Sequence, residues 1–236
     1  MPITPISPAI TLPIISEALN IDIAPTSQFG QAYDVARITT IIRLTNPLPT
    51  PQKFLLPISE ELWAPKMTTE NGLELQFTLD GIDAKALDQL KQQYKTGTEQ
   101  FLQNTSIDNR SILQELANKI YQLSQYTTAQ DVPVGTRLIK FSFTKPINKD
   151  ASGNFLLENL VPMASFAMQN GSKIHAIIAM PFDPAVPPNK IVGTWSQNNV
   201  PNAPQQAIKL DNIDNRIFLH AYWQQDPLLT IKYSYQ

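Results

Sequence analysis

The sequence predicts a mainly β protein, an antiparallel, jelly-roll-like β-sandwich with about two helices inserted between residues 83 and 124. Segments of alternating apolar and polar residues recur along the chain and give about nine to eleven strand candidates. These candidates are not regularly followed by helices, which speaks against a parallel α/β sheet. Prolines, 20 in 236 residues, break up the remaining chain into stiff loops.

The first sixteen residues carry no charge, and four of them are proline. Proline fixes φ and pushes the residue before it into extended conformations, so this stretch is predicted to be an extended arm over residues 1–16. A single β-sandwich domain is expected to follow over residues 17–236. An exposed apolar arm needs a groove, either on its own domain or on a neighbouring copy. The arm residues expected to make subunit contacts are Ile3, Ile6, Ile10, Leu12, Ile14 and Ile15.

The strands expected before the helices follow from alternation and from β-branched content. Leu19, Ile21 and Ile23 alternate with polar residues. Residues 35–44 are rich in Val, Ile and Thr and end at an Asn-Pro turn signal. The alternation at residues 73–79 is the cleanest in the chain. Three closely spaced prolines after residue 46 predict a rigid corner between two of these strands.

Helical spacing replaces alternation in the middle of the chain. Asp83 is a suitable N-cap for a helix over residues 84–95, and Thr96-Gly97 would end it. A second helix is predicted over about residues 109–124, because its leucines and isoleucine recur every three or four positions. This segment is expected either to be an insertion in the β-domain or to cover one sheet.

Strand patterns return after residue 135. Asn170-Gly171 predicts a tight turn just before an apolar strand. The last two strand candidates are predicted to form a C-terminal hairpin, joined across residues 224–227. The strand candidates of this half are 137–144, 174–180, 191–195, 207–210, 217–223 and 228–235.

The composition excludes several classes of function. Charged residues make up 16% of the chain, the net charge is −2 and no run of Lys or Arg occurs, so no direct contact with nucleic acid is expected. The absence of cysteine excludes disulfides, thiolate catalysis and cysteine-ligated metals. Neither a signal peptide nor a transmembrane segment is expected. We therefore expect synthesis in the cytoplasm and a final location in a virion or another large assembly.

No established catalytic or cofactor-binding motif occurs in the chain, so no catalytic residue, cofactor or metal is predicted. His175 and His220 lie in apolar strand candidates, where a structural role is favoured over a catalytic or metal-binding one. The carboxylate pairs Glu60-Glu61 and Asp211/Asp214 are the candidates for hydrolysis. We expect residues 211–215 to be a solvated turn between two strands.

Aromatic residues are dense near the C-terminus and raise the question of a sugar-binding face. Trp195 and Trp223 are the candidate ligand-facing aromatics. Tyr222 and Trp223 are adjacent, so in a strand they must point to opposite faces and only one can belong to any one platform. Packing in the core or in an interface is the competing interpretation of the tryptophans.

Three hypotheses of function follow. The first is a structural, self-assembling protein that is not an enzyme, most specifically a viral capsid or virion coat component held together as a homo-oligomer by subunit contacts and the N-terminal arm. Its partners would be copies of itself and other structural proteins. The second is a β-sandwich module that binds glycans or proteins. The third is a carboxylate-dependent hydrolase.

Overall fold

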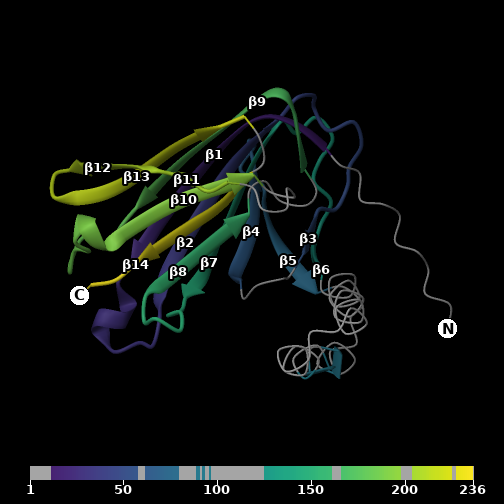
Figure 1. Cartoon of the computed structure of the whole chain (residues 1–236). Helices are drawn as coiled ribbons and strands as arrows, with labels where there is room; N and C mark the ends of the chain where they lie inside the picture. Colours follow the sequence, from purple (N-terminus) through teal and green to yellow (C-terminus); the bar gives the residue numbers. More distant parts are fainter. Residues whose placement is uncertain are drawn as a thin grey trace, which may run out of the picture.

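A computed structural model describes residues 12–57, 62–79, 89, 90, 92, 93, 96, 125–160, 166–197, 204–224 and 227–235. These residues are mainly β and form two sheets that pack face to face (Figure 1). The predicted β-rich sandwich is confirmed at this level. Most of its strands come from the segments whose alternation predicted them, because one face of each strand lies in the core and the other in solvent.

The larger sheet has eight strands from β12 to β5, and β6 and β3 extend it beyond β5 to ten. In spatial order its strands are β12 (Lys209–Ile213), β13 (Arg216–Trp223), β9 (Phe166–Ala179), β1 (Leu12–Ala24), β2 (Asp34–Leu44), β7 (Leu138–Ile147), β4 (Trp63–Thr69), β5 (Glu74–Leu79), β6 (Gln125–Thr128) and β3 (Leu55–Pro57).

The smaller sheet has four strands and covers the β12–β2 half of the larger one (Figure 1). In spatial order they are β11 (Gln206–Ala207), β10 (Ile191–Gln197), β14 (Pro227–Tyr233) and β8 (Phe155–Leu160). Two short 3-10 helices, η1 (Thr26–Phe29) and η2 (Pro188–Lys190), lie in the connections between strands.

One strand pair departs from the predicted antiparallel plan. β1 and β9 run parallel, while every other pair of described strands is antiparallel. Alternation gives the inner and outer faces of a strand but not its direction, so the sequence carried no signal for this pair. The strand order also differs from the two four-stranded sheets of a jelly roll, because the larger sheet runs to ten strands.

The predicted C-terminal hairpin is wrong. β13 pairs with β9 and β12 in the larger sheet, whereas β14 lies between β10 and β8 in the smaller one. The chain therefore crosses from one sheet to the other between Trp223 and Pro227. Both strands bury apolar residues, Leu219 on β13 and Ile231 on β14, and packing these faces against each other hides more apolar surface than a flat hairpin would.

The expected arm is part of the body where the structure describes it. Leu12 and Ile14 belong to β1 and are buried in a core cluster under the β4–β5 half of the larger sheet. Ile15 lies at an irregularity in β1 and is 46% exposed. Ile3, Ile6 and Ile10 lie outside the described residues, and their subunit contacts stay predictions.

The predicted Asn170-Gly171 turn lies inside β9 rather than before it. The register with β1 shifts here: Ile14 pairs with Met168, but Ser16 pairs with Lys173. Gly171 takes up a φ of +86°, which favours glycine. Ser172 stabilises this irregularity in β9. Its hydroxyl donates a hydrogen bond to the carbonyl of Ile14 at 2.6 Å and accepts one from the amide of Gln169 at 2.8 Å.

The helical segment 83–124 lies almost entirely outside the described residues. The five of its residues that are described have helical backbone; they are Gln89, Leu90, Gln92, Gln93 and Thr96. In the described part of the chain, no helix has the length and apolar character needed to cross a membrane.

Candidate interaction surface

The outer face of the larger sheet collects polar side chains from four neighbouring strands. Alternation turns every second residue of β1, β2, β9 and β13 away from the core. The register then places Asp22, Ala179 and Phe218 side by side on β1, β9 and β13. Arg37 of β2 lies opposite Asp22 on the other side. This face, at the β12 end of the sheet, is the candidate interaction surface.

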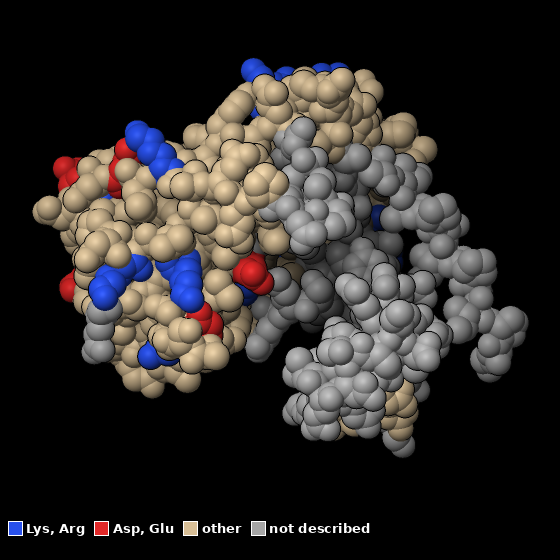
Figure 2. Space-filling view, in the orientation of Figure 1, with Lys and Arg blue, Asp and Glu red and all other residues tan. Residues whose placement is uncertain are grey.

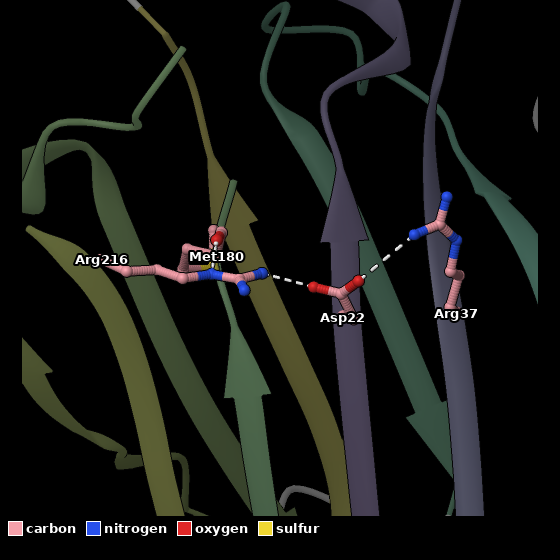
Figure 3. A network of polar contacts seen from close by, with 4 residues as sticks. All are labelled: Asp22, Arg37, Met180 and Arg216. Carbon is pink, nitrogen blue, oxygen red and sulfur yellow. Dashed lines mark hydrogen bonds and ion pairs between the residues drawn. The ribbon is translucent and has the colours of Figure 1, made fainter. Parts of the chain in front are cut away.

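Asp22 lies between two arginines on this face (Figure 3). The Arg216 guanidinium donates to one carboxylate oxygen of Asp22, and its Nε donates to the carbonyl of Met180 at 2.9 Å. Arg37 Nη1 lies 3.5 Å from the other carboxylate oxygen. Arg216 also lies over the Phe218 ring at 5.6 Å, so three contacts fix its position.

The geometry makes Arg216 a cross-brace. Its side chain starts on β13, passes over the end of β9 and reaches β1 (Figure 3). Its side chain is 30% exposed and that of Asp22 is 45% exposed, so water screens this ion pair. With its Nε and one terminal nitrogen engaged by a carbonyl and a carboxylate, this arginine has a structural role.

The two histidines lie on adjacent strands of the same face. His175 is exposed and lies opposite Tyr222, which is 54% exposed. His220 Nε2 lies 3.8 Å from a carboxylate oxygen of Asp211, beyond hydrogen-bond distance, and has no hydrogen-bond partner among the described residues. No group of three or more metal-ligating side chains occurs among the described residues.

The outermost strand of this surface is β12. A two-residue turn, Asp214-Asn215, joins it to β13, and both residues have positive φ, 50° and 63°. The solvated turn expected at residues 211–215 is thus limited to residues 214 and 215, because residues 211–213 belong to β12 and pair with β13. Ile213 and Arg216, the residues on either side of this turn, form a hydrogen-bonded pair. Along β12, hydrogen-bonded and non-hydrogen-bonded pairs with β13 then alternate. The amide groups of Leu210 and Asn212 therefore point away from β13.

Nothing in the described part of the chain covers the outer side of β12. Four of its five residues are exposed, among them Leu210 at 38% and Ile213 at 50%. In Figure 1 the β12–β13 turn projects from one end of the molecule. At that end, Figure 2 shows basic and acidic side chains next to one another, and a second mixed group of charged side chains lies lower on the same face.

The other sheet edges are short or blocked. β3 has three residues and β11 has two. On β8, the Leu156 amide donates to the carbonyl of Asn148 at 3.1 Å, and the Lys145 ammonium donates to the carbonyl of Glu158 at 2.8 Å. A buried lysine that caps an edge carbonyl is a recognised way of preventing strand addition. No comparable hydrogen bond to the outer side of β12 occurs among the described residues.

The predicted ligand-facing tryptophans lie together, but they face the core. The Trp195 and Trp223 rings are 5.9 Å apart and edge-to-face. Trp223 is 3% exposed, and its Nε1 has no hydrogen-bond partner in the described part of the chain. Trp195 is partly buried against the same core cluster. As alternation requires, the neighbouring Tyr222 points outward, and it is the aromatic residue that solvent reaches.

A second polar cluster ties the smaller sheet to η1. Asp34 is fully buried and accepts hydrogen bonds from the Tyr233 hydroxyl at 2.8 Å, the Tyr235 hydroxyl at 2.7 Å and the Ser27 amide at 2.9 Å. Burial, the charge of Asp34 and the hydrogen bonds to it raise the pKa of both tyrosines. The carboxylate is fully engaged by donors of this chain, so the cluster is structural.

The sequence pattern did not mark Arg216, Lys209 or Asp22 as site residues. The two partners of the cross-brace are 194 positions apart, so no local spacing links them. Alternation alone would have placed each on an outer face. Only the pairing of β13 with β9 and of β9 with β1 brings them together.

No model of a protein family matches the chain, and a search of curated proteins also gives no match. Among solved structures, the chain is similar to a protein of Legionella pneumophila described as a putative nutrient binding protein. The identity is 9%, the TM-score is 0.51, and the match covers 94% of this chain and 68% of that one. This likeness concerns the fold alone.

Two structures of M1 zinc metallopeptidases also match, one of them from Deinococcus radiodurans. Both show 8% identity, with TM-scores of 0.40 and 0.39. Each match covers 94% of this chain, but this chain spans only 42% of either peptidase.

Proposed function

We propose that this protein is structural rather than enzymatic and that it associates with copies of itself. The observation that carries the proposal is β12, an exposed strand at the end of a ten-stranded sheet whose outward amide groups have no partner among the described residues. Such an edge is a template for another strand, and proteins that stay monomeric usually block it. Among the described residues, hydrogen bonds occupy the edge of β8 but not the edge of β12.

The narrower form of the proposal is a capsid or virion coat component. It is supported by the uncharged, proline-rich segment 1–16, by the low charge of the chain and by the sandwich architecture. Jelly-roll topology is not needed for it, because subunit contacts depend on exposed edges and faces rather than on strand order. The partners would be copies of this chain and other structural proteins of the assembly.

The test of self-association is the mass of the full chain in solution. Light scattering coupled to size exclusion over a range of concentrations should give a mass that rises above that of one chain. Electron microscopy of the same material should then show rings, tubes or shells if the virion form holds. The mass of a single chain at every concentration would contradict the proposal.

The contribution of the arm is tested separately. Deletion should stop at residue 11, because Leu12 and Ile14 are core residues of β1. A chain that begins at Leu12 keeps this strand whole. If the arm contacts another subunit through Ile3, Ile6 and Ile10, the shortened chain should give smaller particles. Particles of unchanged size would show that association does not use the arm.

A second candidate is a module that binds glycans or proteins. It is favoured by the exposed pair His175 and Tyr222 on the outer face and by the fold-level likeness to the Legionella pneumophila protein. Glycan-array binding should then be lost in Tyr222→Ala and His175→Ala. Trp223→Ala is unsuitable for this test, because removing a buried side chain would destabilise the fold.

The hydrolase hypothesis gains no support from the described residues. Asp214 lies in an exposed turn, and Asp211 forms an ion pair with Lys209. Glu60 and Glu61 lie outside the described residues. No pair of carboxylates with separated roles emerges from the part of the chain that the structure describes.

A further inference from the structure

We propose that two copies of this chain pair through antiparallel β12 strands, centred on Leu210, so that Lys209 of each copy faces Asp211 of the other. This inference rests on the proposed self-association and names the surface and register that carry it. Pairing of this kind would join two ten-stranded sheets into one continuous sheet across a two-fold axis.

The backbone of β12 limits the registers that are available. The amide groups of Leu210 and Asn212 point outward, so hydrogen-bonded pairs with a second β12 must use these two residues. Three antiparallel registers satisfy this requirement. They place Leu210 opposite Leu210, Leu210 opposite Asn212, or Asn212 opposite Asn212 of the partner subunit.

Charge selects the first of the three. With Leu210 opposite Leu210, each Lys209 lies directly opposite Asp211 of the partner subunit, which gives two opposite-charge pairs. With Leu210 opposite Asn212, the two Asp211 side chains face each other, and like charges at this position repel. With Asn212 opposite Asn212, each Asp211 faces an apolar Ile213.

The inner side of the strand favours the same register. Leu210 is 38% exposed and points to the side that faces the core, like the buried Leu219 with which it pairs. Centring the pair on Leu210 brings the two leucines together at the axis, where each removes apolar surface of the other from water. In the other registers Leu210 faces a polar side chain or the turn.

The charged residues are already in place for this exchange. Lys209 Nζ lies 2.7 Å from Asp211 Oδ1 within one strand, and both side chains project from the outer face. Lys209 is 75% exposed, so it turns to a partner strand without opening the core. On pairing, Lys209 of each copy exchanges its contact with Asp211 of its own strand for a contact with Asp211 of the partner strand.

The register is tested by charge reversal in the full chain, with sedimentation velocity as the measurement. Lys209→Asp and Asp211→Lys each place like charges opposite one another, and each should raise the dissociation constant of the dimer by about tenfold. An equimolar mixture of the two variants should dimerise like the parent. In the mixed dimer one copy carries aspartate at both positions and the other carries lysine at both, so each pair across the axis has opposite charges. The double variant Lys209→Asp/Asp211→Lys should also recover.

The matched control is Lys66→Asp, which changes the charge equally on the same sheet. Lys66 forms an exposed ion pair with Glu74 at 3.2 Å on β4 and β5, far along the sheet from β12. This variant should associate like the parent protein. Circular dichroism of every variant confirms that the fold is retained.

The outcomes separate this inference from the proposed function. If the parent associates but the single variants and their mixture behave like it, the β12 register is overturned while self-association stands. If the parent is monomeric at every concentration, both are overturned. Loss of association in each single variant together with recovery in the mixture supports the register, because misfolding of either variant would not be repaired by mixing.

Discussion

Arg216 on β13 reaches across β9 to the carboxylate of Asp22 on β1, so one side chain spans the parallel strand pair (Figure 3). We predict that Arg216→Met lowers the free energy of unfolding by about 1 kcal/mol, because the change breaks an ion pair and leaves the Met180 carbonyl without this donor. Urea denaturation of both proteins measures the difference, which should shrink in high salt.

Arg37→Met provides the matched control for the cross-brace. Arg37 is 65% exposed and contacts the same carboxylate at 3.5 Å, but it bridges only neighbouring strands. Its replacement should change the free energy of unfolding by no more than about 0.5 kcal/mol. If the two variants lose the same free energy of unfolding, the bridge from β13 across β9 to Asp22 stabilises the fold no more than a contact between neighbouring strands.

The alternation in the sequence was enough to predict most strands and their inner faces. Leu19, Ile21 and Ile23 are all buried, as their spacing indicates. β8 and β4 were missed, because neither shows a sustained alternation with turn signals at both ends. Strand direction and sheet membership were also missed, since these depend on which apolar faces meet and not on the pattern within one strand.

The candidate surface was less predictable than the fold. His175, His220 and Asp211 were recognised as separate residues, but the registers of β9, β13 and β12 were needed to place them on one face. Trp223 shows the opposite case. Its residue type suggested a ligand platform, whereas its strand position placed it in the core. Whether Trp223 meets solvent or the core therefore depends on the face of the strand it lies on, and not on its residue type.

At Gly193 the backbone of the smaller sheet lies close to a side chain of the larger one. A Cβ atom added there would overlap Leu219 Cδ2 on β13 and lie 3.4 Å from Ile208 Cβ. Because Leu219 is fully buried, it has little space to withdraw. We predict that Gly193→Ala lowers the free energy of unfolding by about 1–3 kcal/mol through overpacking.

A double-mutant cycle tests whether Leu219 is the cause. Leu219→Ala alone should cost about 2–5 kcal/mol, because it leaves a cavity. In Gly193→Ala/Leu219→Ala the new methyl group occupies part of that cavity, so the combined loss should be smaller than the sum of the two. Additive losses in thermal or urea unfolding would place the clash of Gly193→Ala elsewhere.

Ile14 and Ile15 are neighbours in sequence with opposite environments. Ile14 is fully buried in the second core cluster, and Ile15 is 46% exposed at the irregularity in β1. We predict that Ile14→Ala costs about 2–5 kcal/mol of stability and Ile15→Ala less than about 1 kcal/mol. Should Ile15→Ala prove the more costly in monomeric protein, the described register of β1 would be wrong.

Ile15 also separates packing within one chain from packing between chains. If Ile15→Ala leaves the stability of the monomer unchanged but weakens association, this residue belongs to a subunit contact, as the sequence analysis expected. Sedimentation velocity on the variant gives this answer directly. If Ile15→Ala associates as strongly as the parent protein, Ile15 makes no subunit contact. Any contact of the predicted arm with another subunit would then come from residues before Leu12.

The tyrosines around Asp34 predict a loss of stability at alkaline pH. Burial and the charge of Asp34 raise the pKa of Tyr233 and Tyr235 above the ordinary value of about 10. The unfolded chain therefore releases these protons from about pH 10, while the folded chain retains them. Above this pH the unfolded state binds fewer protons, so the free energy of unfolding falls as pH rises. The fall is up to about 1.4 kcal/mol per pH unit for the buried Tyr233 and smaller for Tyr235, which is partly reached by water.

Phenylalanine variants isolate this contribution. Tyr233→Phe removes a hydroxyl donor from Asp34, so the variant should be less stable than the parent at neutral pH by about 1–3 kcal/mol. Its stability should nevertheless fall less steeply with pH above about 10, because one of the two raised groups is gone. Tyr222→Phe is the matched control for loss of a tyrosine hydroxyl, since Tyr222 is 54% exposed on the outer face of the larger sheet. Urea denaturation at a series of alkaline pH values measures all three slopes, and parallel slopes for the parent and Tyr233→Phe would contradict a raised pKa at this site.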